Sequence, residues 1–294
     1  LAEENDEVDV LVNGDPGSKG TAINHAVRES DADYFAVFDA DERVSPDFIP
    51  TAMGELLDGA EVFQGRRVPR AVGPVETIAY CERALVNAGY AVCELLGFTG
   101  CGSASTVFTR DAFKTVGGYE DCLAEDVRFA HACNNAEFRV AHDRSATNTM
   151  EAPHTVRDLW GQRKRWRMGQ VRASWGGLFD SLRRGSASGF VGSAFRAVGS
   201  VGLGLMLLVV VSHAFVLALE GLETAFFVPS LSAVSAVGVV WLNDYAEGHV
   251  GMPSWTALLA PLVYLGHGLL TLKSVFEYLL TWEGEWYRTS KSGA

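Results

Sequence analysis

Three long stretches without a charged side chain constrain this chain more than any other feature of its sequence. They cover residues 197–219, 225–242 and 250–272, with 23, 18 and 23 residues respectively. A helix needs roughly 20 apolar residues to cross the hydrocarbon core of a bilayer. One such helix would fit a soluble core, but three in succession indicate a membrane. We therefore expect residues 191–294 to form a transmembrane region of about three spans with a short tail.

Charges beside these stretches predict their orientation. Residues 157–184 hold eight Lys and Arg but only two Asp, which suits anionic headgroups or a phosphate-bearing ligand. Basic residues before the first span place the preceding domain in the cytoplasm, and Glu220 and Glu223 then lie outside. Three spans would leave the tail outside, whereas Arg288 and Lys291 favour a tail inside. We expect a multi-pass cell-membrane protein, and one span being re-entrant or interfacial would resolve the conflict.

Composition excludes other classes of protein. The net charge of −12 argues against nucleic acid as a partner. The five cysteines are odd in number and lack zinc-like spacing, so we expect reduced thiols in a cytosolic compartment. The polar, acidic start shows no cleavable signal peptide.

Apolar periodicity predicts an α/β domain over residues 1–150 and an interfacial helical segment over 151–190. The near-continuous apolar run 34–38 is typical of a strand buried on both faces of a parallel sheet. Ser45 and Pro46 have the character of a helix cap and first helical residue. We expect strands at 8–12, 34–38, 62–68, 106–108 and 138–141, and helices at 21–30, from 46, and at 76–96, 110–116 and 125–133.

Asp39 and Asp41 follow the apolar run 34–38. Side chains two apart on an extended chain point the same way, and two carboxylates make a hard oxygen site for Mg²⁺ or Mn²⁺. Ligands of open α/β sheets bind at the carboxyl ends of strands. A solvated acidic loop is the alternative interpretation.

Glu125 and Asp126 are expected in the first turn of a helix. Acidic residues there can simply complement the helix dipole. The functional interpretation makes Asp126 a general base that deprotonates an acceptor hydroxyl.

Gln162, Arg165 and Trp166 form a third group, just before the apolar region. Arg binds a diphosphate with a forked hydrogen bond, and Trp offers a flat face to a sugar ring. An amphipathic interfacial helix explains the same residues, and both interpretations can hold together.

Two loops complete the candidate site. Lys19 lies in a Gly-containing loop at a helix start, which suits a diphosphate, although the spacing is not that of a P-loop. The loop 98–103 is rich in glycine and permits close approach of its backbone to a ligand. An ordinary exposed lysine and a plain turn are the alternatives.

Taken in order, these motifs resemble the family 2 glycosyltransferases with a GT-A fold, and among them the membrane-integrated synthases of cellulose, hyaluronan, chitin and mannan type. The likeness covers roughly residues 8–170. It rests on Lys19-Gly20-Thr21-Ala22-Ile23-Asn24, Asp39-Ala40-Asp41, Cys101-Gly102-Ser103, Gly117-Gly118-Tyr119 with Glu125-Asp126, Glu151-Ala152-Pro153 and Gln162-Arg163-Lys164-Arg165-Trp166. Trp286-Tyr287-Arg288-Thr289-Ser290-Lys291 is similar to a cytoplasmic segment of some relatives, which supports an inside tail.

The resemblance implies a Rossmann-like GT-A mixed sheet, followed by interfacial helices and transmembrane helices. It implies that Asp39 and Asp41 bind Mg²⁺ or Mn²⁺ and, with Lys19 and Arg165, the diphosphate of a UDP- or GDP-sugar. It implies Asp126 as the catalytic base. The acceptor-side residues would be Cys101, Gly102, Ser103, Glu125, Gln162 and Trp166.

The chain departs from the family pattern in two places. The family's first strand, which carries an Asn-Glu pair and is followed by an Asp that grips the nucleotide base, is expected before residue 1, so the chain is expected to be truncated. Ala124 stands where relatives have Thr or Ser.

We therefore expect an inverting, metal-dependent glycosyltransferase on the cytoplasmic face of a membrane. Its acceptor would be a glycan, and repeated transfer would build a polysaccharide. The alternatives are a single transfer to a lipid-linked acceptor and a catalytically inactive membrane scaffold of the same fold.

Overall fold

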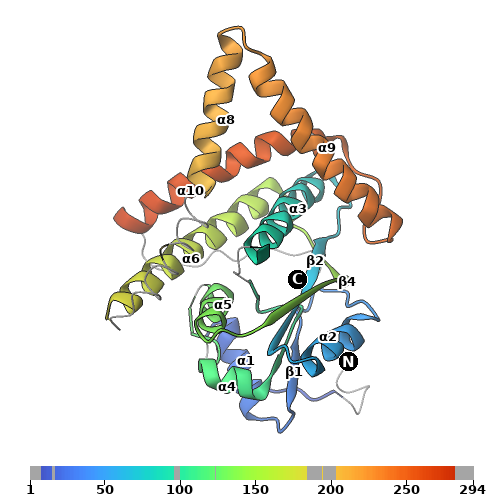
Figure 1. The fold of residues 1–294 in the computed structure, drawn as a ribbon, viewed down its shortest axis with the longest axis vertical. Coiled ribbons are helices and arrows are strands. Elements are labelled where there is room, and N and C mark those ends of the chain that lie inside the picture. The colour runs from blue at the N-terminus through green and yellow to red at the C-terminus, as the bar shows by residue number, and fades with distance from the viewer. Residues whose placement is uncertain are drawn as a thin grey trace.

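The computed structural model describes residues 8–14, 17–95, 100–122, 124–183, 194 and 203–281, which form an α/β part and a helical part (Figure 1). In chain order the elements are α1 (Lys19–Arg28), β1 (Tyr34–Val37), α2 (Phe48–Leu57), β2 (Val62–Pro69), α3 (Pro74–Leu95), β3 (Thr106–Thr109), α4 (Arg110–Val116), α5 (Glu125–Asn135), β4 (Val140–Met150), α6 (Val156–Arg183), α8 (Leu203–Leu219), α9 (Thr224–Ala246), η3 (Trp255–Leu259) and α10 (Ala260–Leu280).

The four strands form one mixed sheet in the order β1-β3-β2-β4. β3 runs antiparallel to both of its neighbours, while β2 and β4 run parallel, with a register shift between Gly65 and Arg66. The expected alternation of strands and helices is confirmed. The expected helix at 110–116 has the bounds of α4, and those at 21–30, 76–96 and 125–133 differ from α1, α3 and α5 by up to two residues at either end.

The expectation that 34–38 is a strand buried on both faces is wrong. β1 is an edge strand, pairs antiparallel with β3, and alternates between exposed and half-buried residues. Its apolar sequence matches a buried parallel strand, but only one neighbour forms in the described part of the chain. A continuous apolar run therefore did not distinguish the centre of the sheet from its edge.

Three local expectations also need correction. Residues 8–12 form no strand, and Val8, Val10, Leu11 and Val12 are exposed, because no described strand pairs with them. Ser45 and Pro46 lie in a turn, and α2 starts after Asp47. The strand expected at 138–141 begins at Val140 and continues to Met150, since it pairs along the whole of β2.

Apolar side chains pack on both faces of the sheet. On one face Phe108 of β3 packs with Ile23, Phe113 and Phe129, so α1, α4 and α5 cover that face. On the other face the cluster contains Phe48, Phe63 and Val107, and α2 covers it. Val107 and Phe108 are adjacent and point to opposite faces, as strand geometry requires. These two apolar layers pack against the sheet and so fix the positions of the strand ends, beside which the candidate site lies.

A third cluster joins the α/β part to the helical part. Tyr80 of α3 packs against Trp241 of α9 with ring centroids 4.2 Å apart, together with Val68, Val237 and Val250. Both parts therefore share one packed interface.

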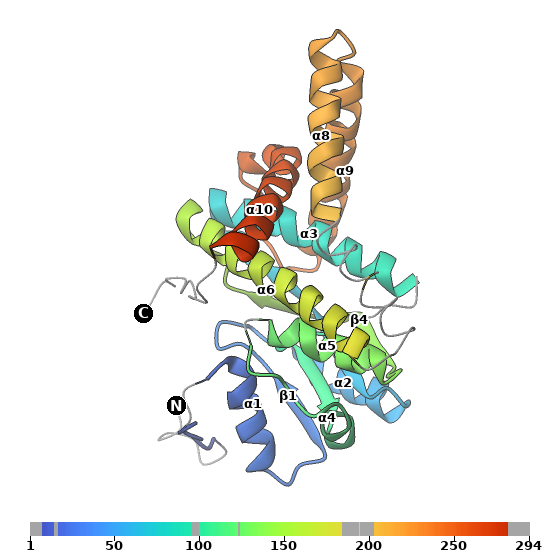
Figure 2. The ribbon, with the colours of Figure 1, turned by 90° about the vertical axis from the view of Figure 1, so that its left-hand side faces the viewer.

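Helices α8 and α9 form a hairpin that projects away from the sheet, and α10 crosses its base (Figures 1 and 2). Within the described residues, only α9 is by itself long and apolar enough to cross a membrane. The segments Trp255–Val263 and Gly268–Leu280 would qualify together but are bent by 48°. The expectation of about three spans, of which one could be re-entrant or interfacial, therefore stays a prediction, and the third apolar stretch is bent in the described residues. The linker at 183–189 and the tail motif at 286–291 fall largely or wholly outside the described residues.

Candidate active site

Strand direction brings several polar side chains to one edge of the sheet. β1 and β2 both run antiparallel to β3, so they are parallel to each other, and β4 runs parallel to β2. Their carboxyl ends therefore meet at the edge where β3 begins. Asp39 follows β1, Arg67 lies near the end of β2, and residues 100–105 lead into β3. Ligands of open α/β sheets bind outside such an edge.

Asp39 lies between two cations. Its Oδ2 accepts a 2.6 Å hydrogen bond from Nη2 of Arg67, and its Oδ1 forms an ion pair with Nζ of Lys19, the first residue of α1. Burial opposes the charge of this carboxylate, but Arg67 and Lys19 outweigh it and lower the pKa of Asp39. The structure therefore brings Lys19 and Asp39 into direct contact, and their charges balance.

Asp41 lies in a turn rather than on a strand. A 3.0 Å hydrogen bond from the Glu42 N–H to the Asp39 carbonyl closes this turn, and Arg70 donates to the Asp41 carbonyl at 3.2 Å. The expectation that strand alternation aligns Asp39 and Asp41 is wrong, because β1 ends at Val37. A turn, not the pleat, holds the two residues together.

The carboxylates of this turn fit a divalent cation that arrives with a diphosphate. Within the described residues, no three His, Cys, Asp or Glu gather in a group that could hold a metal by itself. Mg²⁺ is commonly bound through one or two carboxylates, while phosphate oxygens and water complete its coordination. Asp39 and Asp41, both half-buried, match that donor chemistry.

Asp126 in the first turn of α5 belongs to the same electrostatic group. Its Oδ1 accepts a 2.8 Å hydrogen bond from the Val127 N–H. Burial raises the pKa of Asp126, while this hydrogen bond and the positive charges of Arg67 and Lys19 offset the rise only in part. The same two cations, Arg67 and Lys19, therefore act on both Asp39 and Asp126, although these two aspartates are far apart in the sequence.

Glu125 is tied to the loop before β3. Its Oε1 accepts a 3.0 Å hydrogen bond from the Ser103 hydroxyl. Burial and the neighbouring Asp126 raise the pKa of Glu125, so this carboxyl is also easier to protonate than a free one. The two adjacent carboxyl groups thus differ in their partners. Glu125 is held by the Ser103 hydroxyl, whereas Asp126 interacts with the positive charges of Arg67 and Lys19.

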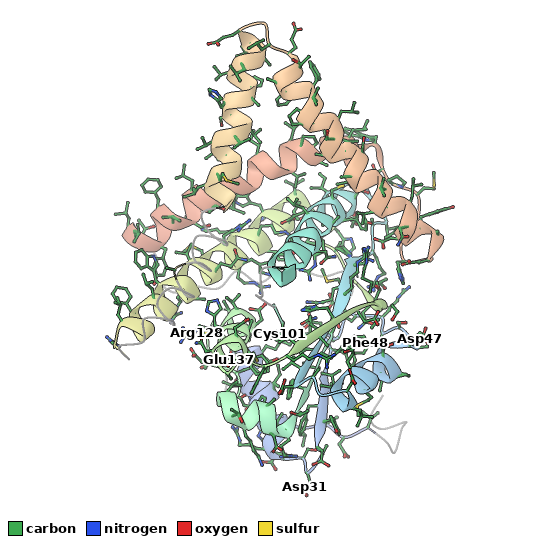
Figure 3. The ribbon with its side chains drawn as sticks, in the orientation of Figure 1. Asp31, Asp47, Phe48, Cys101, Arg128 and Glu137 are labelled. Carbon is green, nitrogen blue, oxygen red and sulfur yellow. The ribbon has the colours of Figure 1, made fainter. Side chains whose placement is uncertain are left out.

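The loop before β3 is fixed by its backbone. The Gly102 N–H donates a 2.5 Å hydrogen bond to Oε1 of Gln64, and the Gly102 carbonyl accepts from the Tyr119 hydroxyl at 3.1 Å. Cys101, which Figure 3 labels beside α5, is buried in the same core cluster as Cys133. The Cys101 side chain therefore lies in the core, Ser103 is buried as well, and Gly102 is the more accessible residue of this loop.

Gln162, Arg165 and Trp166 lie on α6, where their neighbour Arg163 contacts two of them, Gln162 and Trp166. Arg163 forms a buried ion pair of 2.5 Å with Glu82 of α3, stacks 4.1 Å over the Trp166 ring and donates to Oε1 of Gln162. Within the described part of the chain, no hydrogen bond or ion pair joins these three residues to the carboxylates at the sheet edge. α6 itself contacts α5, which carries two of those carboxylates.

Three residues at the site were not anticipated from the sequence: Arg67, Glu42 and Gln64. Glu42 pairs with Nε of Arg67, and its side chain is 0% exposed. A signal was present, because Arg67 is the penultimate residue of the predicted strand 62–68 and therefore lies near its carboxyl end. Their partners, however, come from separate segments and could not be assigned from spacing.

Comparisons with known proteins bear on this site. A family model described as "Glycosyl transferase family group 2" matches residues 34–267. No curated protein is matched by the sequence. Among solved structures, the chain is similar to "Mannosyltransferase PcManGT from Pyrobaculum calidifontis in complex with GDP-Man and Mn2+", at 15% identity and a TM-score of 0.56, over 96% of this chain and 73% of that one. At that identity the likeness shows a shared fold.

Proposed function

Because the chain belongs to glycosyl transferase family group 2, we propose that it moves a sugar from a nucleotide-diphosphate sugar to a glycan acceptor, with inversion at the anomeric carbon. One observation carries this proposal. At the carboxyl edge of a GT-A-like sheet, the positive charges of Lys19 and Arg67 act on both Asp39 and Asp126. The similar mannosyltransferase was solved with GDP-Man and Mn2+, which supports a nucleotide sugar as donor, and we propose a GDP- or UDP-sugar.

Asp126 is the proposed general base. Burial raises the pKa of Asp126, which makes its carboxylate a stronger proton acceptor than a free one and suits it to act as a base. As the acceptor oxygen forms its bond to the anomeric carbon, its proton passes to Asp126. The bond between that carbon and the diphosphate oxygen breaks, and the electron pair leaves with the diphosphate.

Lys19 and the turn of Asp39 and Asp41 are the proposed donor side. Mg²⁺ or Mn²⁺, when bound there, would neutralise charge on the departing diphosphate. Lys19, at the start of α1, adds a cation and a helix amino terminus on the same side. Arg165 would add a further cation on the side of α6.

The acceptor side is proposed around Gly102, Ser103 and Glu125, with Trp166 as the surface for a sugar ring and Gln162 as its polar neighbour. Cys101 would contribute its backbone, since its thiol is buried. The roles of the α6 residues rest on the family resemblance, because the observed contacts of Gln162 and Trp166 are with Arg163.

A nucleotide-sugar panel tests the proposal. Membranes containing the protein would be offered UDP- and GDP-sugars, with nucleotide release as the measurement. We expect release from one donor and its loss when EDTA removes the divalent cation, because the diphosphate then leaves without neutralisation. Release that is equal with and without EDTA would contradict the metal site, and no release from any donor would favour the inactive scaffold. A ladder of products indicates repeated transfer, whereas one adduct indicates single transfer to a lipid-linked acceptor.

We further propose that the α8–α9 hairpin crosses the bilayer twice and that α10 lies along the cytoplasmic interface. At 1.5 Å per residue, the 17 residues of α8 measure about 26 Å, close to the ~30 Å hydrocarbon core. α9 is longer, with 23 residues, and its last turns, from Val237 to Asp244, pack on the α/β part outside the bilayer. The hairpin exposes large apolar side chains, including Val209, Phe215, Phe227, Leu231 and Val239. Its tip carries Glu220 and Glu223, as expected of a turn in water.

The position of α10 supports an even number of crossings. α10 crosses the base of the hairpin and packs against α6, with an ion pair of 3.1 Å between Lys164 and Glu277 (Figure 1). Its other faces expose Leu262, Leu269 and Phe276. A helix with one polar, protein-bound side and one apolar side suits an interface. Two crossings return the chain to the cytoplasm, which would resolve the conflict between three spans and a basic tail.

Cysteine labelling tests this arrangement. In intact cells, an impermeant maleimide is expected to label Leu222→Cys at the hairpin tip but not Thr281→Cys at the end of α10. Permeabilisation should expose Thr281→Cys. The unsubstituted protein gives the background, since Cys81, Cys101 and Cys133 are buried and Cys122 is half-buried. Labelling of both positions from the same side would contradict two crossings.

A further inference from the structure

We propose that Arg67 is a positioning residue that holds Asp39 in place for the divalent cation, while Lys19 is the exchangeable cation that the metal displaces. The inference rests on the proposed function, because it concerns the donor side of that site. It assigns different tasks to two cations that contact the same carboxylate.

A chain of buried polar side chains holds Arg67 in place. Its Nε pairs with Oε1 of Glu42, whose side chain is 0% exposed. Oε2 of Glu42 accepts a 3.0 Å hydrogen bond from the Ser105 hydroxyl, and that hydroxyl accepts one of 2.9 Å from Nδ2 of Asn148. Asn148 Oδ1 in turn accepts from the Ser45 N–H at 2.9 Å. Arg67 is thus the outer end of a buried polar chain that links β2, β3 and β4.

Strand direction keeps Arg67 at the edge. After the register shift at Gly65, Arg67 lies opposite Asn148 of β4. Arg66, its neighbour, reaches the other way and pairs with Asp244 of α9. Since Arg66 and Arg67 are each paired with a buried carboxylate, rotation of this part of β2 would break two ion pairs. Arg67 therefore presents its Nη2 to Asp39 from a fixed place.

Lys19 is held far more loosely. Its side chain is 33% exposed, against 19% for Arg67, and its ion pair with Oδ1 of Asp39 is at the first residue of α1. An exposed lysine can turn toward a phosphate at little cost, because water replaces its partner. Arg67 cannot leave without stranding the buried charge of Glu42. Displacement of Lys19 would free Oδ1 for the cation, while Oδ2 stays on Arg67.

The two cations should therefore affect metal binding with opposite signs. Binding of Mn²⁺ in the presence of GDP or UDP, which supplies the diphosphate oxygens but carries no sugar to transfer, is measured by the loss of the electron paramagnetic resonance signal of free Mn²⁺, relative to the nucleotide without protein. Lys19→Gln removes a competitor and should tighten Mn²⁺ binding, roughly two- to fivefold. Arg67→Gln removes an outer partner of the ligand and should weaken it by about 10–100-fold. Arg43→Gln, a change of an exposed arginine near the same turn, should bind Mn²⁺ like the unsubstituted protein.

A second variant guards against misfolding. Arg67→Gln leaves Glu42 buried and unpaired, so the double variant Arg67→Gln/Glu42→Gln removes both charges and should fold while retaining the weak Mn²⁺ binding. Circular dichroism reports folding, and if both variants fail to fold, Arg67→Lys decides by the same Mn²⁺ measurement, because it keeps a charge opposite Glu42 but cannot bridge two carboxylates. It too should bind Mn²⁺ more weakly.

Three results would overturn the inference: no saturable Mn²⁺ binding to the unsubstituted protein, unchanged binding in the folded Arg67 variants, or weaker binding in Lys19→Gln. The Mn²⁺ measurement needs no turnover. If Mn²⁺ binding tightens in Lys19→Gln and weakens in Arg67→Gln but no nucleotide sugar is consumed, the proposed function fails and the roles of Arg67 and Lys19 stand. If sugar is transferred but the signs differ, the roles fail alone.

Discussion

Replacing Asp126 by Asn is expected to lower the rate of sugar transfer by about 10²–10⁴-fold, the range that a positioned general base contributes. The amide cannot accept the proton of the acceptor hydroxyl, while the donor-side contacts of Lys19 and Asp39 remain. Nucleotide-sugar binding, measured by calorimetry, should therefore survive in this variant. The matched control is Asp111→Asn, which removes an exposed carboxylate in the first turn of α4 and should leave transfer unchanged.

The pH profile provides a second reading of the same variant. Burial raises the pKa of Asp126 above its ordinary value, and a general base works only when it is deprotonated. Transfer by the unsubstituted enzyme should therefore fall as the pH falls through that raised pKa. The residual activity of Asp126→Asn should lack this acidic limb. Equal rates, or an acidic limb that persists in the variant, would remove Asp126 from the mechanism.

Replacing Asp244 by Ala is expected to destabilise the protein by about 3–5 kcal/mol, the cost of leaving one partner of a buried ion pair alone. Asp244 is 0% exposed and accepts two hydrogen bonds from the Arg66 guanidinium, at 2.6 and 2.8 Å, and one from the Tyr80 hydroxyl. Burial and then the Asp244 carboxylate raise the pKa of Tyr80, which keeps its hydroxyl as the donor. Loss of Asp244 would detach the end of α9 from β2 and α3.

Thermal unfolding in detergent, followed by circular dichroism, measures this effect as a drop of the midpoint by several degrees. Glu247→Gln, on an exposed side chain just after α9, is the control and should unfold like the unsubstituted protein. The double variant Asp244→Leu/Arg66→Met replaces the ion pair by apolar side chains and should recover most of the loss. An unchanged midpoint in Asp244→Ala would show that this ion pair does not hold the two parts together.

Local sequence signals predicted most of the individual elements. The helix expected at 110–116 is present because Thr109 accepts a hydrogen bond from the Ala112 N–H at its start and Gly117 adopts a φ of +82° at its end. The residues that meet at the site were also selected from their types: Lys19 contacts Asp39 and also acts on Asp126 through its charge. Signals for caps and helix ends lie within a few residues of one another, so they can be read from a single sequence.

Partners distant in the chain could not be predicted in this way. The edge position of β1, the buried Glu42 beneath Arg67 and the closure of the Asp39 turn depend on which strands become neighbours. The bidentate pair of Arg66 and Asp244 joins residues 178 positions apart, and nothing in the apolar pattern of α9 marked that aspartate as buried.

Propensity, capping and periodicity act over short distances, so the kinds of elements, the motif residues of a glycosyltransferase and the apolar region that follows them could be predicted from the residues alone. The order of the strands, the cation that holds Asp39 and the way α10 crosses the hairpin base depend instead on the folded chain. A charge is stabilised by the groups that packing brings beside it, and packing involves the whole chain.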